Sequence, residues 1–344
     1  MPTKTRFALK GKGRDSYLRL VLAFPLASIR SDEHLTEAQK VLDKLLAEPE
    51  LDDGAATYLD ALSDRIIPVL EDRPLSVVRV HRGQEAFMQK HVPKYAPPWV
   101  QTVRLWAETS KREVSYALCN DRRTLLWFAN QRAVEYHPTL VRADHLDRVT
   151  HLVLDLDPPD ANAFALAVRT AHLMHAALDD VGLAGAVKTS GAKGLHIFVP
   201  VAPTVSMEDA AAATRALAVR AERLDPSLAT TAFMKEDRAG KVFVDSTRLG
   251  GATVVAAYSP RVRPGVPVSY PVGWEDLDDI APADFTVHTA AQKLGRRNPW
   301  KTQMVAPQAL SQDLIDEGHA IPVARVQAMH EGKRRKRART KKDE

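Results

Sequence analysis

The chain has 344 residues, enough for one large domain or two small ones, and its 45% hydrophobic and 26% charged residues are typical of a soluble globular protein. No apolar run reaches the ~18 residues that span a bilayer, and no secretory signal is present at the N-terminus, so we expect a cytoplasmic protein with no membrane partner. Cys119 is the single cysteine, which excludes an internal disulfide and a cysteine-rich zinc site, and we expect it to be a buried core residue.

The net charge of +5 is unevenly distributed along the chain. Residues 333–344 carry eight Lys or Arg and two acidic residues, a net charge of +6, so the other 332 residues carry −1. We therefore expect a near-neutral folded body and a disordered basic tail. The tail either adds sequence-independent affinity for phosphates or serves only as a solubilising terminus.

The N-terminal half predicts helices followed by short strands. In chain order, the expected elements are helices over 35–47 and 55–72, the second interrupted by Pro68, a short strand after Pro74, a loop over 91–99, strands within 102–118 and a helix over 122–135.

The C-terminal half alternates more clearly between strands and helices. The expected elements are a strand over 151–157, a helix over 161–181 that stops at Gly182, two strands around a turn within 186–201, a helix over 206–224 capped by Ser206, and strands over 241–245 and 252–257.

Two aspartates end the apolar strand HLVLDLD. Because side chains alternate along a strand, Asp155 and Asp157 point the same way. Two carboxylates on one face repel each other unless a cation lies between them, and Mg²⁺ or Mn²⁺ prefers such oxygen ligands. A solvated strand end or the N-cap of the next helix would explain the pair equally well.

The segment KTSGAKGLH, residues 188–196, predicts a turn that holds phosphate. Its backbone N–H groups would cradle the anion, Lys188 and Lys193 would add positive charge, and Ser190 would donate from its hydroxyl. A simple hairpin uses the same glycines, and His196 could be either a phosphate ligand or a core histidine.

A third carboxylate, Asp245, ends the strand KVFVD. An isolated aspartate at this place is usually a turn or cap residue. Together with Asp155, Asp157 and the predicted phosphate turn, however, it completes the parts of a two-metal phosphoryl-transfer site.

In this order, LVLDLDP, SGAKGLHIFVP and KVFVDSTR resemble the archaeo-eukaryotic primase superfamily, in particular the primase-polymerase domain of the bacterial end-joining enzyme ligase D. Segments 73–93, 133–158, 254–277 and 285–300 carry the resemblance on both sides of these motifs. It implies an α/β (α+β) fold with a primase-like core, in which two lobes of mixed sheet enclose a cleft around an RRM-like catalytic module. The expected regions are an N-terminal helical extension (1–72), the catalytic core (73–305), a C-terminal helical segment (306–331) and the basic tail (332–344).

The resemblance also implies roles for individual residues. Asp155, Asp157 and Asp245 would be catalytic and bind Mn²⁺ or Mg²⁺. The expected nucleotide-binding residues are His137, Ser190, Lys193, His196, Arg238, Arg248 and Arg261, and the expected DNA-binding residues are Lys44, Arg79, Phe87 and Lys90. Lys44 would hold the 5′-phosphate across a gap, and Phe87 would stack on a base.

Four positions depart from the family pattern. Arg248 replaces a common glutamine, Met88 replaces a frequent aromatic residue, Val78 replaces a lysine, and Gly54 lies near the place of a second 5′-phosphate lysine. These departures bear on template grip and gap recognition rather than on metal chemistry.

The implied activity is the addition of one or a few nucleotides, preferably ribonucleotides, from NTP or dNTP to a primer 3′ end at gapped or broken DNA with a 5′-phosphate. The chain carries no ligase signature, so we expect a stand-alone actinobacterial-type enzyme at the nucleoid, with a separate ATP-dependent DNA ligase and Ku as partners.

Two other functions fit parts of the sequence. A haloacid-dehalogenase-type phosphatase would use Asp155 as a nucleophile, but Pro158 and Pro159 stand where that motif has small or hydroxyl residues. A catalytically inactive DNA-end-binding scaffold would not need all three carboxylates.

Overall fold

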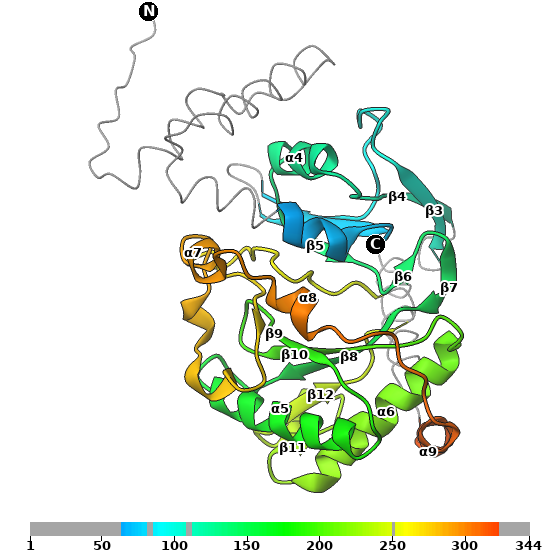
Figure 1. Ribbon diagram of the computed structural model, residues 1–344, viewed down its shortest axis with the longest axis vertical. Coiled ribbons are helices and arrows are strands. Elements are labelled where there is room, and N and C mark those ends of the chain that lie inside the picture. Colours follow the sequence, from blue (N-terminus) through cyan, green and yellow to red (C-terminus); the bar gives the residue numbers. More distant parts are fainter. Residues whose placement is uncertain (1–62, 81–84, 108–111, 250–251, 323–344) are drawn as a thin grey trace, which may run out of the picture.

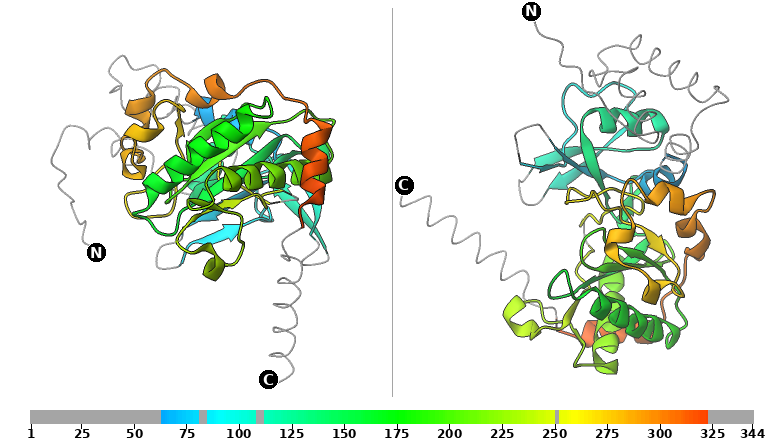
Figure 2. Two further views of the ribbon diagram at one scale, coloured as in Figure 1. Left: turned by 90° about the horizontal axis from the view of Figure 1, so that it is seen from below. Right: turned by 90° about the vertical axis from the view of Figure 1, so that its left-hand side faces the viewer.

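The computed structural model describes residues 63–80, 85–107, 112–249 and 252–322, which form two lobes (Figure 1). The helix expected over 35–47, Lys44, Gly54 and the basic tail lie outside the described residues. The lobes lie one above the other in the right-hand view of Figure 2, each built around its own β-sheet. Among the described residues, none of the helices is both long and apolar enough for a membrane span.

The smaller lobe is a five-stranded antiparallel sheet. Its strands are β1 (Leu75–Arg79), β2 (Phe87–Gln89), β3 (Thr102–Ala107), β4 (Arg112–Ala117) and β5 (Ala133–Pro138). They are ordered β2-β1-β4-β3, and β5 also pairs with β1. The strands expected within 102–118 and the loop over 91–99 are confirmed. Cys119 is fully buried, as expected, but lies beyond the end of β4.

Two helical predictions for this lobe need correction. Residues 63–70 are helical through Pro68, which lies in the last turn and does not interrupt the helix. Helix α4 (Arg122–Asn130) ends five residues before the predicted boundary. Arg132 has a positive φ of 62°, which reverses the chain into β5.

The larger lobe contains a six-stranded sheet. Its strands are β8 (His151–Asp157), β9 (Ala186–Thr189), β10 (Leu195–Pro200), β11 (Ala229–Thr230), β12 (Val242–Asp245) and β13 (Pro271–Val272). The order is β11-β12-β8-β10-β9-β13, and all pairs are antiparallel except β11 with β12. This topology places β8, the strand with the paired aspartates, in the middle of the sheet.

Helices α5 (Phe164–Asp179) and α6 (Met207–Leu224) cover one face of this sheet (Figure 1). Ser206 caps α6 by accepting a hydrogen bond from the Asp209 amide, as the sequence predicts. The remaining elements are the hairpin β6 (Val141–Arg142) and β7 (His145–Val149), the 3₁₀ turns η1 (Lys235–Arg238), η2 (Leu277–Asp279) and η3 (Pro282–Asp284), and helices α7 (Ala290–Leu294), α8 (Pro299–Gln303) and α9 (Gln312–Ala320).

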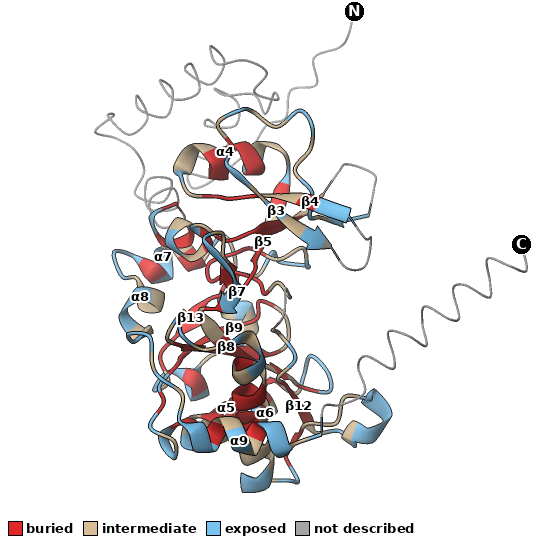
Figure 3. Cartoon of the chain, turned by 90° about the vertical axis from the view of Figure 1, so that its right-hand side faces the viewer, coloured by how far each residue is buried: buried red, intermediate tan, exposed pale blue. Residues whose placement is uncertain are grey.

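The core is concentrated around β8, α5 and α6, whereas β3 is largely exposed (Figure 3). Leu152, Leu154 and Leu156 of β8 are fully buried. Because side chains alternate along a strand, Asp155 and Asp157 share the opposite face. The same central strand therefore anchors the core and presents two carboxylates away from it.

The segment over 252–257 links the two lobes. The sequence predicts a strand here, but the backbone forms only an isolated bridge between Thr253 and Thr139 and hydrogen bonds from Val254 to Pro138 and from Ala256 to Tyr136. An irregular segment along β5 is the better description.

Candidate active site

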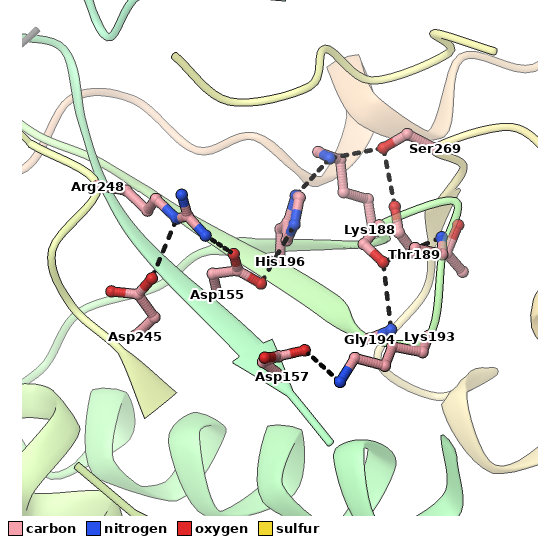
Figure 4. Close-up of polar contacts among 12 residues, drawn as sticks. Asp155, Asp157, Lys188, Thr189, Lys193, Gly194, His196, Asp245, Arg248 and Ser269 are labelled. Carbon is pink, nitrogen blue, oxygen red and sulfur yellow. Dashed lines mark hydrogen bonds and ion pairs between the residues drawn. The ribbon is translucent and has the colours of Figure 1, made fainter. Parts of the chain in front are cut away.

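Sheet register brings the three predicted carboxylates together. In the antiparallel pair β8–β12, Asp245 lies directly opposite Asp155, and Asp157 is two residues further along β8 (Figure 4). All three side chains therefore occupy one face of the sheet. The sequence predicted this convergence, although it could not supply the register.

Arg248 lies between Asp155 and Asp245. Its Nη2 is 2.7 Å from Asp155 Oδ2, and its Nε is 3.2 Å from Asp245 Oδ2. Asp155 Oδ1 lies 3.4 Å from His196 Nε2, and the Thr247 amide and hydroxyl donate to Asp245 Oδ1. Burial alone would raise the pKa of Asp155, but His196 and Arg248 outweigh it and hold this pKa well below the usual range.

Asp157 has its own pair of cations. Lys193 Nζ is 2.9 Å from Oδ1, and Arg238 Nη1 is 3.4 Å from Oδ2. Arg238 also donates to the carbonyl oxygens of Ala232 and Phe233, which fixes its guanidinium beside the strand end. Every carboxylate oxygen of the three aspartates thus has a partner within the chain.

Lys188 lies beneath the site and not at its surface. Its side chain is fully buried, and Nζ is 2.8 Å from His196 Nδ1 and 2.6 Å from Ser269 Oγ. Burial, and after it the charge of Arg261, lowers the pKa of Lys188 well below its usual value. The prediction that Lys188 faces a phosphate is therefore wrong, because β9 turns this side chain under His196.

Asp155 and Lys188 together fix the tautomer of His196. The Asp155 carboxylate can only accept, so the ring carries its proton on Nε2, which faces Asp155, and Nδ1 accepts from Lys188 Nζ. Burial, followed by the charge of Lys188, lowers the pKa of His196 to about 4, so the ring is neutral near pH 7. His196 is therefore a neutral donor and not a cation.

The turn between β9 and β10 closes on its own serine. The amides of Ala192 and Gly194 donate to Ser190 Oγ, so they are not available to a phosphate as the sequence suggested. A hydroxyl that accepts two bonds still has its own proton to donate. Gly191 has a φ of +66°, and a Cβ there would lie 2.6 Å from Arg261 Cγ, so this position requires glycine.

Glu135 is a site residue that the sequence did not identify. Its Oε2 lies 2.7 Å from His137 Nε2 and 3.0 Å from Arg261 Nε, and its Oε1 accepts from the Val262 amide. Arg261 in turn donates to the Ser190 carbonyl oxygen. Glu135 thus joins β5 of the smaller lobe to the turn of the larger lobe. An acidic residue within the mostly apolar strand AVEYHP was the available signal.

Replacing Glu135 with glutamine should change the pH dependence of stability. Burial raises the pKa of Glu135, but His137, Arg261 and the Val262 amide outweigh it and lower this pKa to about 2, from an ordinary value of 4.5. The stabilisation is therefore present above pH 4.5 and is lost as the pH falls toward 2. We expect Glu135→Gln to lower the free energy of unfolding by about 1–2 kcal/mol at pH 7, after allowance for solvent screening.

Urea denaturation at pH 7 and at pH 3 measures this difference. The gap between wild type and Glu135→Gln should shrink at pH 3. Glu113, whose side chain is 64% exposed in a 3.8 Å pair with Arg104, provides the control Glu113→Gln, with little effect at either pH. An equal loss for Glu135→Gln at both pH values would contradict the assigned shift.

Both lobes line a cavity of about 850 Å³ over these groups. Of the predicted site residues, it brings together His137, Asp155, Asp157, Ser190, Lys193, His196, Arg248 and Arg261. Met88 of β2 also lines it. Asp245 and Arg238 lie beside the cavity, held to its carboxylates through Arg248 and Asp157 respectively.

The predicted DNA-binding residues divide into two groups. Phe87 is 40% exposed and Lys90 is exposed, both at the β2 edge of the smaller lobe. Arg79 is buried, and its guanidinium donates to the Gln131 carbonyl and to Gln89, a placement that favours a structural role.

The donor set fits a hard divalent cation. Three carboxylates on one sheet face offer the oxygen ligands that Mg²⁺ and Mn²⁺ prefer. As the side chains are placed, no three His, Cys, Asp or Glu among the described residues lie close enough together to hold a metal. Instead, Arg248 and Lys193 bind oxygens of these carboxylates.

Comparison with known proteins agrees with this geometry. The family described as "LigD, primase-polymerase domain" matches residues 53–300. The bifunctional non-homologous end joining protein LigD of Bacillus subtilis is 30% identical over 263 residues, which cover 74% of this chain and 42% of that protein. The multifunctional LigD of Mycolicibacterium smegmatis is 32% identical over 227 residues, 64% of this chain and 30% of that protein.

A solved structure shows the same fold. The polymerase domain from Mycobacterium tuberculosis ligase D in complex with DNA has a TM-score of 0.64 and 30% identity, with 72% of this chain and 88% of that chain covered. The present chain therefore corresponds to nearly all of that polymerase domain but to less than half the length of the curated relatives.

Proposed function

Since the chain belongs to the LigD primase-polymerase domain family, we propose that it is a DNA-repair nucleotidyltransferase that adds nucleotides to primer 3′ ends at short gaps or breaks. The observation that carries the proposal is the meeting of Asp155, Asp157 and Asp245 with the Ser190 turn and Arg261 at one cavity between the lobes. Family membership and fold leave no support for the haloacid-dehalogenase alternative.

Asp155, Asp157 and Asp245 would hold the divalent ions, Mn²⁺ or Mg²⁺. Bound there, two such ions would lower the pKa of the primer 3′-hydroxyl and stabilise the pyrophosphate leaving group. Ser190 would donate its remaining hydroxyl proton to the triphosphate, and Arg261 would add positive charge beside it. Neutral His196 would orient Asp155 through Nε2, in the tautomer that Asp155 and Lys188 fix.

The smaller lobe would provide the grip on DNA. Phe87 and Met88 are 40% and 45% exposed on β2, next to the cavity that Met88 lines. Stacking of a base on Phe87 would contribute about 1–3 kcal/mol. Lys90 would contact a phosphate, whereas Arg79 would act indirectly by holding Gln89 in β2. The proposed catalytic core over 73–305 contains all of these groups.

The partners follow from the proposed reaction. We propose NTP or dNTP as the second substrate, with ribonucleotides preferred, and gapped or broken DNA with a 5′-phosphate as the first. A separate ATP-dependent ligase and Ku would complete repair. The relatives whose names include non-homologous end joining support this assignment.

Extension of a labelled primer in a one- to three-nucleotide gap tests the proposal. With Mn²⁺ we expect addition of one or a few nucleotides, severalfold faster from ribonucleotides and on gaps with a 5′-phosphate. One of the two lysines expected to hold the 5′-phosphate is missing, with Gly54 near its place. The increase in extension rate caused by a 5′-phosphate should therefore be modest. Binding to DNA ends without extension would favour the inactive scaffold, and phosphate release from small esters would favour a phosphatase.

A further inference from the structure

Arg248 occupies the space between the two more buried of the three site aspartates. The side chains of Asp155 and Asp245 are 16% and 9% exposed, whereas that of Arg248 is 41% exposed. The guanidinium binds one oxygen of each, Oδ2 of Asp155 at 2.7 Å and Oδ2 of Asp245 at 3.2 Å (Figure 4). A single arginine thus bridges a cross-strand pair of carboxylates and offsets one of their two negative charges.

The other oxygens of this pair are already in use. Asp155 Oδ1 faces His196, and Asp245 Oδ1 accepts two hydrogen bonds from Thr247. An ion shared by Asp155 and Asp245 would therefore take the two Oδ2 atoms that Arg248 now binds. A metal ion and a guanidinium cannot occupy the same oxygens at these distances, because both are cations and repel each other.

We propose that Arg248 is a built-in counter-ion that competes with a divalent metal ion for Asp155 and Asp245, and that it must leave this pair before a metal can be shared between them. The proposal rests on the metal site of the proposed function. The Arg248 side chain has room to move away from the carboxylates, because it lines the cavity over them and is partly exposed. An anion that enters the cavity would draw the guanidinium away and so favour metal binding, a coupling that acts equally in both directions.

Lys193 should compete with a metal ion less strongly than Arg248. It pairs with Asp157, whose side chain is 34% exposed compared with 16% for Asp155 and 9% for Asp245, so solvent screens this carboxylate more strongly. Lys193 also contacts one carboxylate and not two. Of these two cations, Arg248 is therefore the one whose removal should increase metal affinity more.

Mn²⁺ binding to the 344-residue chain without DNA or nucleotide tests the competition. Measuring free Mn²⁺ by electron paramagnetic resonance, we expect Arg248→Gln to bind the tightest Mn²⁺ about tenfold more strongly than wild type, about 1.4 kcal/mol. Arg248→Lys keeps the charge but not the planar fork that contacts both carboxylates, so its Mn²⁺ affinity should lie between those of wild type and Arg248→Gln. Arg263 is exposed at the rim of the same cavity, and Arg263→Gln removes the same charge away from the carboxylates, so it should change affinity less than twofold. Equal or weaker Mn²⁺ binding by Arg248→Gln overturns the proposal.

Thermal unfolding of wild type and Arg248→Gln, each in EDTA and in Mn²⁺, provides a second test. In EDTA, Arg248→Gln leaves two buried carboxylates without their shared cation, so its Tm should fall by about 3 °C. Saturating Mn²⁺ should remove most of this deficit, because the metal replaces the lost charge. A deficit of the same size in EDTA and in Mn²⁺ would mean that Arg248 has only a structural role, which contradicts the proposal.

These measurements separate the proposal from the function it rests on. Failure of the wild-type protein to extend a primer at saturating Mn²⁺ would reject the proposed polymerase activity alone. The order of Mn²⁺ affinities among wild type, Arg248→Gln and Arg263→Gln would still decide the role of Arg248, since it requires no turnover.

Discussion

Replacing Asp155 or Asp157 with asparagine should reduce nucleotide addition at a primer 3′ end on the order of 10³-fold, a loss of about 4 kcal/mol in transition-state stabilisation. Asparagine keeps the size of aspartate but offers one neutral oxygen in place of two anionic ones. Both side chains share the cavity face of β8, so each substitution removes negative charge from the proposed metal site. Single-turnover primer extension at saturating Mn²⁺ measures the effect.

The control for these variants must exclude unfolding. Asp155 pairs with His196 and Arg248 in the metal-free protein, so Asp155→Asn should also lower the Tm by a few degrees in EDTA. Asp179→Asn changes an exposed aspartate of α5, remote from the cavity, and should leave both extension and Tm unchanged. If folded Asp155→Asn and Asp157→Asn proteins extend primers within tenfold of wild type, the carboxylates do not carry the reaction.

The sequence predicted the site strands well because their signals are local. HLVLDLD, KVFVD and the segment around Ser190 each combine an apolar run with polar residues at its end, and the structure has β8, β12 and the β9–β10 turn there. The Ser206 cap is equally local, and so is the left-handed Gly182, although α5 spans Phe164–Asp179 and is shorter at both ends than the predicted 161–181. The helix boundary near Arg132 was wrong because a positive φ on an arginine has no clear sequence signature.

The electrostatics of the site could not be predicted in the same way. They depend on which residues of separate strands lie opposite each other. Lys188 meets His196 because β9 and β10 pair in one particular register, and a shift of one residue would turn Lys188 to the other face. Glu135 and Val262 are 127 positions apart, so their hydrogen bond follows only from the packing of the two lobes. The Arg248 bridge likewise required both the register of β8 with β12 and the turn after β12.

Replacing Gly194 with alanine should both destabilise the protein and inactivate the site. A Cβ at this position would lie 2.0 Å from the carbonyl oxygen of Leu156, the residue between the two aspartates of β8. The clash is with main chain, so β8 or the start of β10 must move. We expect the free energy of unfolding to fall by about 3 kcal/mol and the Tm by about 5–10 °C. Thermal unfolding and primer extension on the same preparation measure both effects.

The activity loss should exceed what partial unfolding explains. At a temperature where the Gly194→Ala protein is fully folded, extension should still fall about 100-fold, because displacement of catalytic groups by about 1 Å has effects of this order. Gly182→Ala is the control for a glycine variant that is destabilised without a clash, since Gly182 has a φ of +67° just beyond α5 and no atom within 4 Å of an added Cβ. It should lose about 1 kcal/mol to backbone strain and leave extension unchanged. If Gly194→Ala loses stability but extends primers at the wild-type rate, the close approach of β10 to β8 stabilises the fold but does not position the carboxylates for catalysis. The proposed coupling of strand spacing to catalysis would then have to be abandoned.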